Sequence, residues 1–562
     1  MPVAAYSKTE QRVSAPSPAT HPSWRFGGLS AAELMPHLQR YVYAQNPKAN
    51  WQLVWLNNDG RPVIGLLPKV SWSVYYANHA QYSAKQTAYH VVKTCRNFKQ
   101  NKSHSSTTAT MSYSDWQEEL IAYSQDYDTY NDDSISVKED NQQPIYHHGL
   151  IGFIGYDIAA YELSPTATIE LATQPCAVLG HYDIYLSLNA EQTSWQLNIK
   201  TSLTDTDSVR NHEQKDILVN RLIEHLDDLD SKLSHQNLEK PTLEASPQTM
   251  PLRLTAQWKK LDYQQAFDKT QNYLKQGDCY QINLTQEWKG SFNQSISNNA
   301  SLPKLIEYLP ALHHDTKTPF AGYLAINDIN NAVNNKISNN QFELLSCSPE
   351  LFFTFVKNEN TGKHHICTKP IKGTMPRGLN PEQDDAYKQQ LIDSEKDRAE
   401  NVMIVDLLRN DLGKYAKIGS VKVPKLFAIE SFSNVHHMVS TITAELKTDT
   451  HPLEVLFGSL PAGSITGTPK KRAVEIIAEL ERAPRGAYCG TMGYMNFDGS
   501  GQWNVLIRTL QANTSSNDKL GKSGQISLWA GGGITIASDY DAEYQECHDK
   551  VDNLLSILSQ ET

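Results

Sequence analysis

The chain has 562 residues and a formal net charge of −11 at pH 7. Because it also lacks a dense run of lysine and arginine, its composition argues against nucleic acid or an anionic membrane surface as the main partner. The seven cysteines are scattered and form no C-x-x-C pair, so we expect neither a disulfide framework nor a zinc site. No stretch approaches the roughly 20 apolar residues of a membrane helix, and the N-terminus has no targeting pattern, so we expect a cytoplasmic protein.

The N-terminal part, residues 1–250, alternates short strand-like runs with polar turns. The segment from about 99 to 145 is rich in Ser, Thr, Asn and Asp and predicts a solvated surface insertion with a helix-like patch near 116–123. The run 178–199 predicts two strands. Apolar residues at helical spacing predict an amphipathic helix over 216–233.

A polar link with prolines, at about 239–251, marks the predicted boundary to a C-terminal region, residues 251–562. That region opens with a predicted helix over 263–277, which ends at Gly277. Two Asn/Ser-rich patches, about 327–341 and 512–525, predict loops. Strands and helices do not alternate regularly, which favours an α+β protein over a parallel βαβ sheet.

Lys372 stands between Ile371 and Gly373 in a segment bounded by Pro370 and Pro376. Proline at both ends excludes a helix there. The residues around it leave two interpretations open, a solvated surface charge and a nucleophile.

Two acidic helices follow in the sequence. On the first, Asp393, Asp397 and Glu400 share one stripe, which is either a solvated face or one side of a divalent cation site. The second is predicted as one helix over 541–558 and carries Glu543 and Glu546 on one face. Because magnesium often takes only one or two protein carboxylates, one glutamate from each helix would suffice for a Mg²⁺ site.

The run from Gly458 to Arg472 is similar to a phosphate loop, but Ser464 follows Gly463 where that motif needs lysine. It predicts a loop and then a helix with Thr468 as N-cap and Pro469 at its first position. The helix start is either an ordinary capped end or a binding site for a carboxylate, which its free backbone N–H groups would suit.

Arg508 shares a strand face with Leu506 and Leu510 if this segment is extended, which predicts a buried partner carboxylate. Three consecutive glycines, 531–533, allow a ligand to approach the backbone, although a bulge is the commoner cause.

Five segments in this order resemble the chorismate-utilising enzymes: Pro370–Thr374, Glu400–Leu407, Val435–Ser440, Gly463–Gly467 and Glu543–Lys550. The resemblance covers about 255–560 and extends more loosely to the run Gly152–Asp157 in the N-terminal region, which is similar to anthranilate synthase component I. It implies a large two-sheet antiparallel β-sandwich with peripheral helices and a site in the cleft between the sheets.

Two positions imply which reaction the chain performs. Relatives that add water to chorismate carry lysine where this chain has Gln281, and anthranilate synthases carry alanine where it has Lys372. The resemblance therefore implies conversion of chorismate and ammonia to 4-amino-4-deoxychorismate, for p-aminobenzoate and folate, through a covalent bond to Lys372. The alternatives are an anthranilate synthase component I and a non-catalytic chorismate-binding or regulatory module.

The resemblance also implies the roles of individual residues. Glu350 is the acid/base for the departing hydroxyl, Glu400 and Glu546 are the principal Mg²⁺ ligands, and Asp397 and Glu543 support them. His436 and His437 are indistinguishable by sequence, although His437 matches the family position. The residues expected to contact substrate are Gln281, Thr374, His437, Thr466, Tyr488, Arg508, Gly531, Gly532, Gly533 and Lys550.

A glutaminase domain needs a cysteine in a Gly-x-Cys-x-Gly elbow, and no cysteine of this chain has that setting. We therefore expect ammonia to come from a separate glutamine amidotransferase subunit, component II, or from free ammonium.

Overall fold

The structure is a computed structural model, and it describes residues 22–45, 52–77, 88–96, 104–128, 143–200, 209–236, 251–294, 304–326, 339–358, 360–432, 435–517 and 521–560. The predicted link at 239–251 lies outside this part of the chain except for Pro251, as does most of the predicted loop at 327–341. No helix in the described ranges is long and apolar enough to cross a membrane.

Two 12-stranded sheets form the body of the protein, and every strand pairing within them is antiparallel. Sheet A runs in the order β1 (Ser23–Trp24), β10 (Trp195–Ile199), β9 (Ile184–Leu188), β3 (Val63–Leu67), β2 (Val54–Leu56), β13 (Phe320–Ile326), β14 (Asn339–Ser348), β23 (Thr509–Asn517), β24 (Gly521–Ile534), β12 (Gln281–Gln294) and β11 (Thr255–Ala256), with β20 (Gly467–Thr468) beside β12. Sheet B runs in the order β17 (Ile371–Pro376), β19 (Val435–Glu445), β16 (His364–Lys369), β15 (Leu351–Lys357), β22 (Gly501–Asn504), β21 (Thr491–Asn496), β7 (Gly149–Ile154), β8 (Ala177–His181), β4 (Val70–Tyr76), β5 (Tyr89–Arg96) and β6 (His104–Met111), with β18 (Lys422–Ser431) beside β19.

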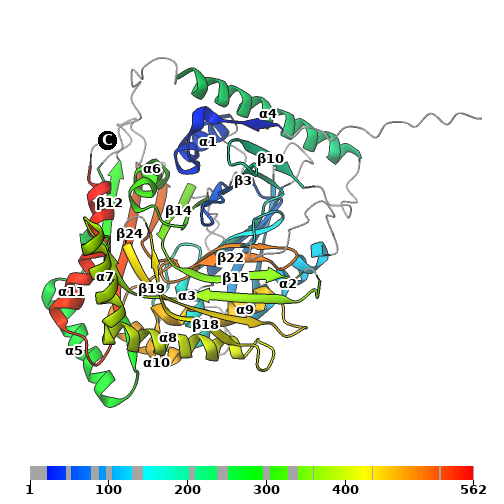
Figure 1. The fold of residues 1–562 in the computed structure, drawn as a ribbon. Coiled ribbons are helices and arrows are strands. Elements are labelled where there is room, and N and C mark those ends of the chain that lie inside the picture. The colour runs from blue at the N-terminus through cyan, green and yellow to red at the C-terminus, as the bar shows by residue number, and fades with distance from the viewer. Residues whose placement is uncertain are drawn as a thin grey trace, which may run out of the picture.

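The helices lie around the outside of the two sheets, with α4 at the top of Figure 1 and α8 and α10 at the bottom. They are α1 (Ala31–Gln45), α2 (Tyr113–Asp128), α3 (Tyr156–Leu163), α4 (Val209–Gln236), α5 (Lys260–Gln276), α6 (Leu305–Thr316), α7 (Pro381–Asp393), α8 (Glu395–Gly413), α9 (Pro452–Ser459), α10 (Lys470–Glu481), α11 (Tyr540–Asp549) and α12 (Asp552–Leu558), with 3₁₀ turns η1 (Phe26–Gly28) and η3 (Gly463–Ile465).

Three buried clusters show how these layers pack. One joins sheet A to helices that include α1, α4, α5, α6 and α12, and another joins sheet B to α2, α3, α8 and α9. The third lies between the sheets, where Leu324 and Phe342 of sheet A meet Phe153 and Tyr494 of sheet B. This inner layer confirms the α+β fold with a two-sheet antiparallel sandwich and peripheral helices.

Strands from the two ends of the sequence alternate within both sheets. In sheet A, β2 of the N-terminal region pairs with β13 of the C-terminal region. In sheet B, β21 of the C-terminal region pairs with β7 of the N-terminal region, with Gly493 opposite Gly152. The boundary predicted near residue 250 therefore divides the sequence but does not separate two independently built sheets.

Several local predictions are confirmed. Helix α4 buries Leu222, Leu226, Leu229 and Leu233 on one stripe, as the 216–233 pattern predicts. Helix α5 ends at Gly277, whose φ of 80° is the left-handed conformation that favours glycine at this position.

Other local predictions are wrong. Within the predicted solvated insertion, residues 104–111 form strand β6, which pairs with β5. The helix-like patch near 116–123 is confirmed, because it lies in α2, which buries Trp116 against Phe457 with ring centroids 5.4 Å apart. The run 178–199 holds parts of three strands rather than two. The described part of the patch at 512–525 belongs to strands β23 and β24. Residues 512–517 of β23 pair in register with residues 521–526 of β24, so the sheet continues through this polar sequence.

Three further corrections concern helix ends. Asp393 does not share a helical stripe with Asp397 and Glu400, because α7 ends at Asp393 and α8 begins at Glu395, with Ser394 capping both. The helix predicted over 541–558 is two helices, α11 and α12, which meet at Lys550 and Val551. Helix α10 begins at Lys470 with Pro469 as its N-cap, so Thr468 is not the cap. Thr468 lies in β20 instead and pairs with Gln281 of β12.

Candidate active site

Lys372 lies on β17, at one edge of sheet B, and points towards helix α8. Its Nζ lies 3.6 Å from Glu400 Oε2, and the two side chains are only 15% and 12% exposed. The next residue, Gly373, has a φ of 82°, and a methyl group there would lie 2.9 Å from Asp397 Cγ. The glycine therefore lets β17 approach α8 closely, and Lys372 is not a solvated surface charge.

Gln281 faces Lys372 from the other sheet. It lies at the start of β12, its side chain is fully buried, and neither of its amide atoms has a hydrogen-bond partner among the described residues. A methyl group on Gly533 of β24 would overlap the Gln281 amide and would lie 3.3 Å from Lys372 Nζ. Because a buried amide without partners is costly, this one is suited to hold a polar ligand.

Glu350 lies at the crossover between β14 of sheet A and β15 of sheet B, and it is buried. Burial raises the pKa of its carboxyl to about 7, although Lys372, the Ser464 hydroxyl, Lys550 and the Ile371 backbone lower it. A carboxyl with this pKa is protonated in a large fraction of molecules at neutral pH, so it can donate a proton.

The four predicted metal ligands approach one another from two helices. Asp397 and Glu400 lie on α8, and Glu543 and Glu546 lie on α11. A methyl group on Gly532 would lie 2.8 Å from Glu543 Oε2 and 3.7 Å from Glu546 Oε1. Helix α11 therefore presents its carboxylates to β24, while Asp397 of α8 lies against Gly373 of β17.

Lysines pair with these carboxylates. Lys396 Nζ lies 3.3 Å from Glu543 Oε1, and Lys550 Nζ lies 2.6 Å from Glu546 Oε1. Burial raises the pKa of Glu400; Lys372 and Lys396 oppose this, and the neighbouring Glu543 and Asp397 add to it.

We tested whether these residues fit a metal. In the described part of the chain, no three His, Cys, Asp or Glu side chains are grouped closely enough to hold one. Glu400 Oε1 is nevertheless buried without a hydrogen-bond partner. This oxygen, with three further carboxylates near it, is a donor of the kind that suits a Mg²⁺ ion bound by few protein oxygens.

Arg508 differs from the sequence prediction. Its φ is 51°, so the segment is not extended there, and no hydrogen bond or ion pair to its guanidinium is found within the described ranges. An internal carboxylate partner is therefore not found among the described residues. Burial lowers the pKa of Arg508 but leaves it a cation at neutral pH. A largely buried, unpaired guanidinium is suited to a carboxylate ligand.

Lys550 and Tyr488 also lie at this end of sheet A. Lys550 Nζ donates to the Gly531 carbonyl over 2.8 Å in addition to its pairing with Glu546. The Tyr488 ring stacks on Trp529 of β24, with centroids 6.1 Å apart. The three glycines 531–533 continue β24 in register with β12 and form no bulge.

The structure distinguishes the two histidines, which point to opposite faces of β19. His436 Nε2 lies 2.9 Å from Asp384 Oδ1, and its Nδ1 lies 2.8 Å from Ser431 Oγ. His437 Nδ1 lies 2.8 Å from Thr374 Oγ1, and the Arg508 charge is near it. Burial, with the nearby Arg508 charge, lowers the pKa of His437 to about 4, so it is neutral at pH 7.

Thr466 is held inside its own loop. Its hydroxyl donates to the Ala462 carbonyl over 2.7 Å, and its carbonyl accepts from Asn283 N. The sequence prediction did not single out its neighbour Ser464, which lies near Glu350 and lowers the pKa of that carboxyl. A serine in a glycine-rich loop gave no signal for such a contact.

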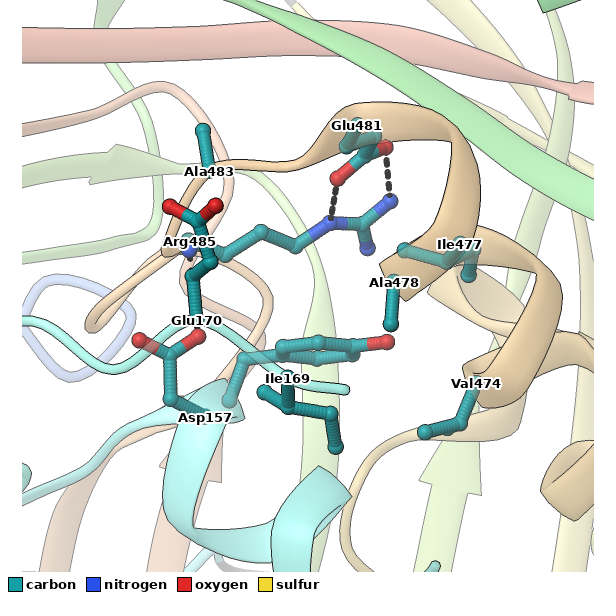
Figure 2. Close-up of a pocket in the computed structure, with 10 residues that line it drawn as sticks. Asp157, Ile169, Glu170, Val474, Ile477, Ala478, Glu481, Ala483 and Arg485 are labelled. Atoms are coloured by element: carbon teal, nitrogen blue, oxygen red, sulfur yellow. Dashed lines mark hydrogen bonds and ion pairs between the residues drawn. The ribbon is translucent and has the colours of Figure 1, made fainter. Parts of the chain in front are cut away.

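A small cavity between α3 and α10 contains charged residues that the sequence prediction also missed (Figure 2). The buried Arg485 guanidinium bonds to both Glu481 oxygens, at 2.8 and 2.6 Å, and to the Asn283 carbonyl at 2.8 Å. Asp157 accepts the backbone N–H groups of Arg485 and Gly486, and burial raises its pKa to about 7. This network fixes the turn that leads to Tyr488.

Comparisons with known proteins identify the family. The family described as chorismate binding enzyme matches residues 75–556. The aminodeoxychorismate synthase component 1 of Salmonella typhimurium is 35% identical over 422 residues, which cover 74% of this chain and 77% of the relative. That of Escherichia coli is 35% identical over 464 residues, which cover 79% of this chain and 86% of the relative.

One solved structure shows the fold. Anthranilate synthase component I from Streptococcus pneumoniae has a TM-score of 0.57 and 20% identity, with 88% of this chain and 91% of that chain covered. The family model matches most of the chain, and two relatives are 35% identical to it, so the family is established. The chain belongs to the chorismate-binding enzyme family.

Proposed function

We propose that this chain converts chorismate and ammonia to 4-amino-4-deoxychorismate and water. The observation that carries the proposal is that the side chains of Lys372 and Gln281 both lie next to Gly533. It is supported by the two relatives at 35% identity, which are named aminodeoxychorismate synthase component 1.

Lys372 is the nucleophile in this proposal. Its neutral amine attacks C2 of the ring, the two ring double bonds shift, and the C4–O bond breaks. Ammonia then attacks C4, the double bonds shift back, and the C2–N bond to Lys372 breaks. The enolpyruvyl group stays on the ring throughout.

Glu350 is the acid that protonates the departing C4 hydroxyl, which leaves as water. Its raised pKa, about 7, supports this role. After the hydroxyl leaves, the Glu350 carboxylate can take a proton from the incoming ammonia, which restores the acid for the next cycle.

The two substrate carboxylates need positive or donor groups. Arg508 supplies an unpaired guanidinium, and the Tyr488 hydroxyl and the backbone of 531–533 supply further polar contacts. Lys550 contributes its charge as part of its ion pair with Glu546. His437 and Thr374 line the ring side of the site as a hydrogen-bonded pair.

Mg²⁺ is the proposed cofactor, with Glu400 and Glu546 as principal ligands and Asp397 and Glu543 in support. When bound, it would supply positive charge to a substrate carboxylate. The fit is supported by the unpartnered, buried Glu400 Oε1.

Ammonia is proposed to come from a separate glutamine amidotransferase subunit, component II. The relatives are named as component 1, which supports a second component. Free ammonium should replace it in the test tube.

The test incubates the full chain with chorismate, Mg²⁺ and ammonium and identifies the product by mass. A product that retains the enolpyruvyl group and has exchanged hydroxyl for amine supports the proposal. Release of pyruvate with fluorescent anthranilate would instead identify an anthranilate synthase, and unchanged chorismate would indicate a binding module.

A further inference from the structure

A buried serine stands where the chain crosses from sheet A to sheet B. Ser348 is the last residue of β14, and Glu350 lies between it and β15. The Ser348 hydroxyl donates to the Val505 carbonyl over 2.5 Å and accepts the backbone N–H of Glu350 at 3.3 Å. One fully buried side-chain oxygen therefore joins the backbone of Glu350 to a second segment, residues 505–508.

The segment 505–508 lies between β22 and β23 and ends with Arg508. At its start, Val505 N donates to the Glu350 carbonyl over 3.1 Å, and at its end the Arg508 carbonyl accepts from Cys347 N over 3.0 Å. Both ends of the segment are therefore bonded to residues that flank Ser348.

The Val505 carbonyl is the point at which this segment turns. It accepts Ile507 N over 2.8 Å in addition to the Ser348 hydroxyl, so both of its lone pairs have a donor. A bond between residues two apart closes a tight turn, and the next residue, Arg508, has a φ of 51°. Because the turn determines where the Arg508 side chain begins, the Ser348 hydroxyl acts on Arg508 as well as on Glu350.

The two residues act on the same small molecule. Glu350 protonates the C4 hydroxyl and Arg508 binds a carboxylate, and the covalent bonds of chorismate limit the distance between these two groups. We propose that Ser348 is a positioning residue, whose hydroxyl sets the distance between the acid Glu350 and the carboxylate-binding Arg508. Both roles come from the proposed function, on which this inference rests.

Ser346 provides a matched control. It is also fully buried on β14, and its hydroxyl lies 2.8 Å from Thr509 Oγ1 of β23. Ser346 and Thr509 are already partners in the β14–β23 ladder, so this bond joins two strands that the backbone holds together. Ser346→Ala therefore removes one buried hydroxyl from the same strand and leaves the bonds of Val505 and Glu350 in place.

The experiment measures kcat and KM for chorismate in the full chain, with Mg²⁺ and ammonium saturating. Ser348→Ala and Ser346→Ala are compared with wild type, and Ser348→Ala is also combined with Arg508→Met and with Glu350→Gln. The dissociation constant for chorismate is measured by calorimetry with and without Ser348→Ala in a Lys372→Ala background, where the lysine forms no covalent bond. Melting temperatures show that each variant is folded at the assay temperature.

We expect Ser348→Ala to lower kcat and to raise KM for chorismate, each roughly tenfold, because the acid and the cation no longer fit one substrate position. Ser346→Ala should match wild type in both constants, although each variant loses a buried hydrogen bond and a similar amount of stability. Residues that act through one another are not additive. The rise in KM should therefore disappear when Arg508 is already Met, and the fall in kcat should disappear when Glu350 is already Gln.

Equal kinetics of Ser348→Ala and Ser346→Ala would overturn the inference. Additivity in either combined variant would also overturn it, because a merely structural role would lower activity in every background. A wild-type chain that does not aminate chorismate would defeat the proposed function. The calorimetric arm does not need turnover: a dissociation constant that Ser348→Ala leaves unchanged would defeat the positioning of Arg508 separately.

Discussion

Gln281 of sheet A and Lys372 of sheet B meet at Gly533, where the missing side chain leaves room for both. The nucleophile of the proposed reaction therefore depends on a glycine that belongs to a third strand, β24.

Gly533→Ala should abolish turnover without unfolding the protein. The added methyl group would overlap the Gln281 amide and crowd Lys372 Nζ, so we expect a loss of roughly 100-fold or more in kcat/KM for chorismate. Gly413→Ala is the control, because a methyl group there meets nothing within 4 Å. Equal activity of the two variants would contradict the arrangement.

Lys372→Ala should remove the covalent intermediate. Intact-protein mass spectrometry after incubation with chorismate, without ammonia, should detect an adduct on the wild-type chain and none on the variant. Lys369→Ala is the control, because Lys369 pairs with Glu430, 2.9 Å away, outside the site. An adduct that persists in Lys372→Ala would exclude Lys372 as the nucleophile.

Glu350→Gln should separate activity from stability. The wild-type pKa, raised to about 7 by burial, means that folding favours the protonated carboxyl. The protonated Glu350 carboxyl contributes fully to the free energy of unfolding below pH 4.5, the pKa of the group in the unfolded chain. This contribution is lost as the pH rises through about 7, the pKa in the folded protein. The wild-type chain should therefore lose stability relative to Glu350→Gln between about pH 4.5 and 7, by up to about 3 kcal/mol.

The same variant should lose most of its kcat, because glutamine cannot donate the proton. Urea titrations at pH 5 and pH 8 provide the stability measurement. If the stability difference between the two proteins does not change with pH, the raised pKa is wrong.

Arg508→Met should weaken substrate binding and leave the fold intact. Its guanidinium has no partner among the described residues, so its removal breaks no ion pair and relieves the cost of burying a lone charge. We expect KM for chorismate to rise roughly ten- to a hundred-fold while Tm stays equal or increases. Arg409→Met, at an exposed pair with Asp406, should change neither quantity. A large fall in Tm for Arg508→Met would show that Arg508 is structural.

Removal of metal should stop turnover. Chelation with EDTA is expected to abolish product formation, and Mg²⁺ should restore it. Glu400→Gln should raise the Mg²⁺ concentration needed for half-maximal activity, because it removes one of the few carboxylates facing the ion. Full activity after chelation would exclude the cofactor.

The sequence predicts most of the architecture and the neighbourhood of Lys372, because its motifs are long and ordered. Apolar spacing identifies α4, and the Gly277 position identifies the end of α5. Features that depend on the folded chain could not be predicted in this way: Arg508 has a positive φ, so the segment is not extended there, and no pattern in Leu506–Leu510 reveals this. Likewise, Lys470 is an ordinary helix-start lysine until Asp411, 59 residues earlier, is found beside it.

A polar composition also led to wrong loop predictions. The polar strands β6 and β23 form because each pairs along its backbone with a neighbouring strand, which a Ser/Thr/Asn-rich sequence does not exclude. His436 and His437 are adjacent in β19, so their side chains point to opposite faces of the strand. His436 hydrogen-bonds to Asp384 and His437 to Thr374, and only the folded strand distinguishes them.

The pairing of β2 with β13 and of β7 with β21 means that neither end of the chain can complete a sheet alone. A fragment that begins at residue 251 would expose the backbone edges of β13 and β21 to water and to other molecules. We expect such a fragment to aggregate when expressed by itself and to become soluble when the fragment 1–250 is supplied with it. The two pieces would then behave as mutually required subunits, and activity would return only in the reassembled complex.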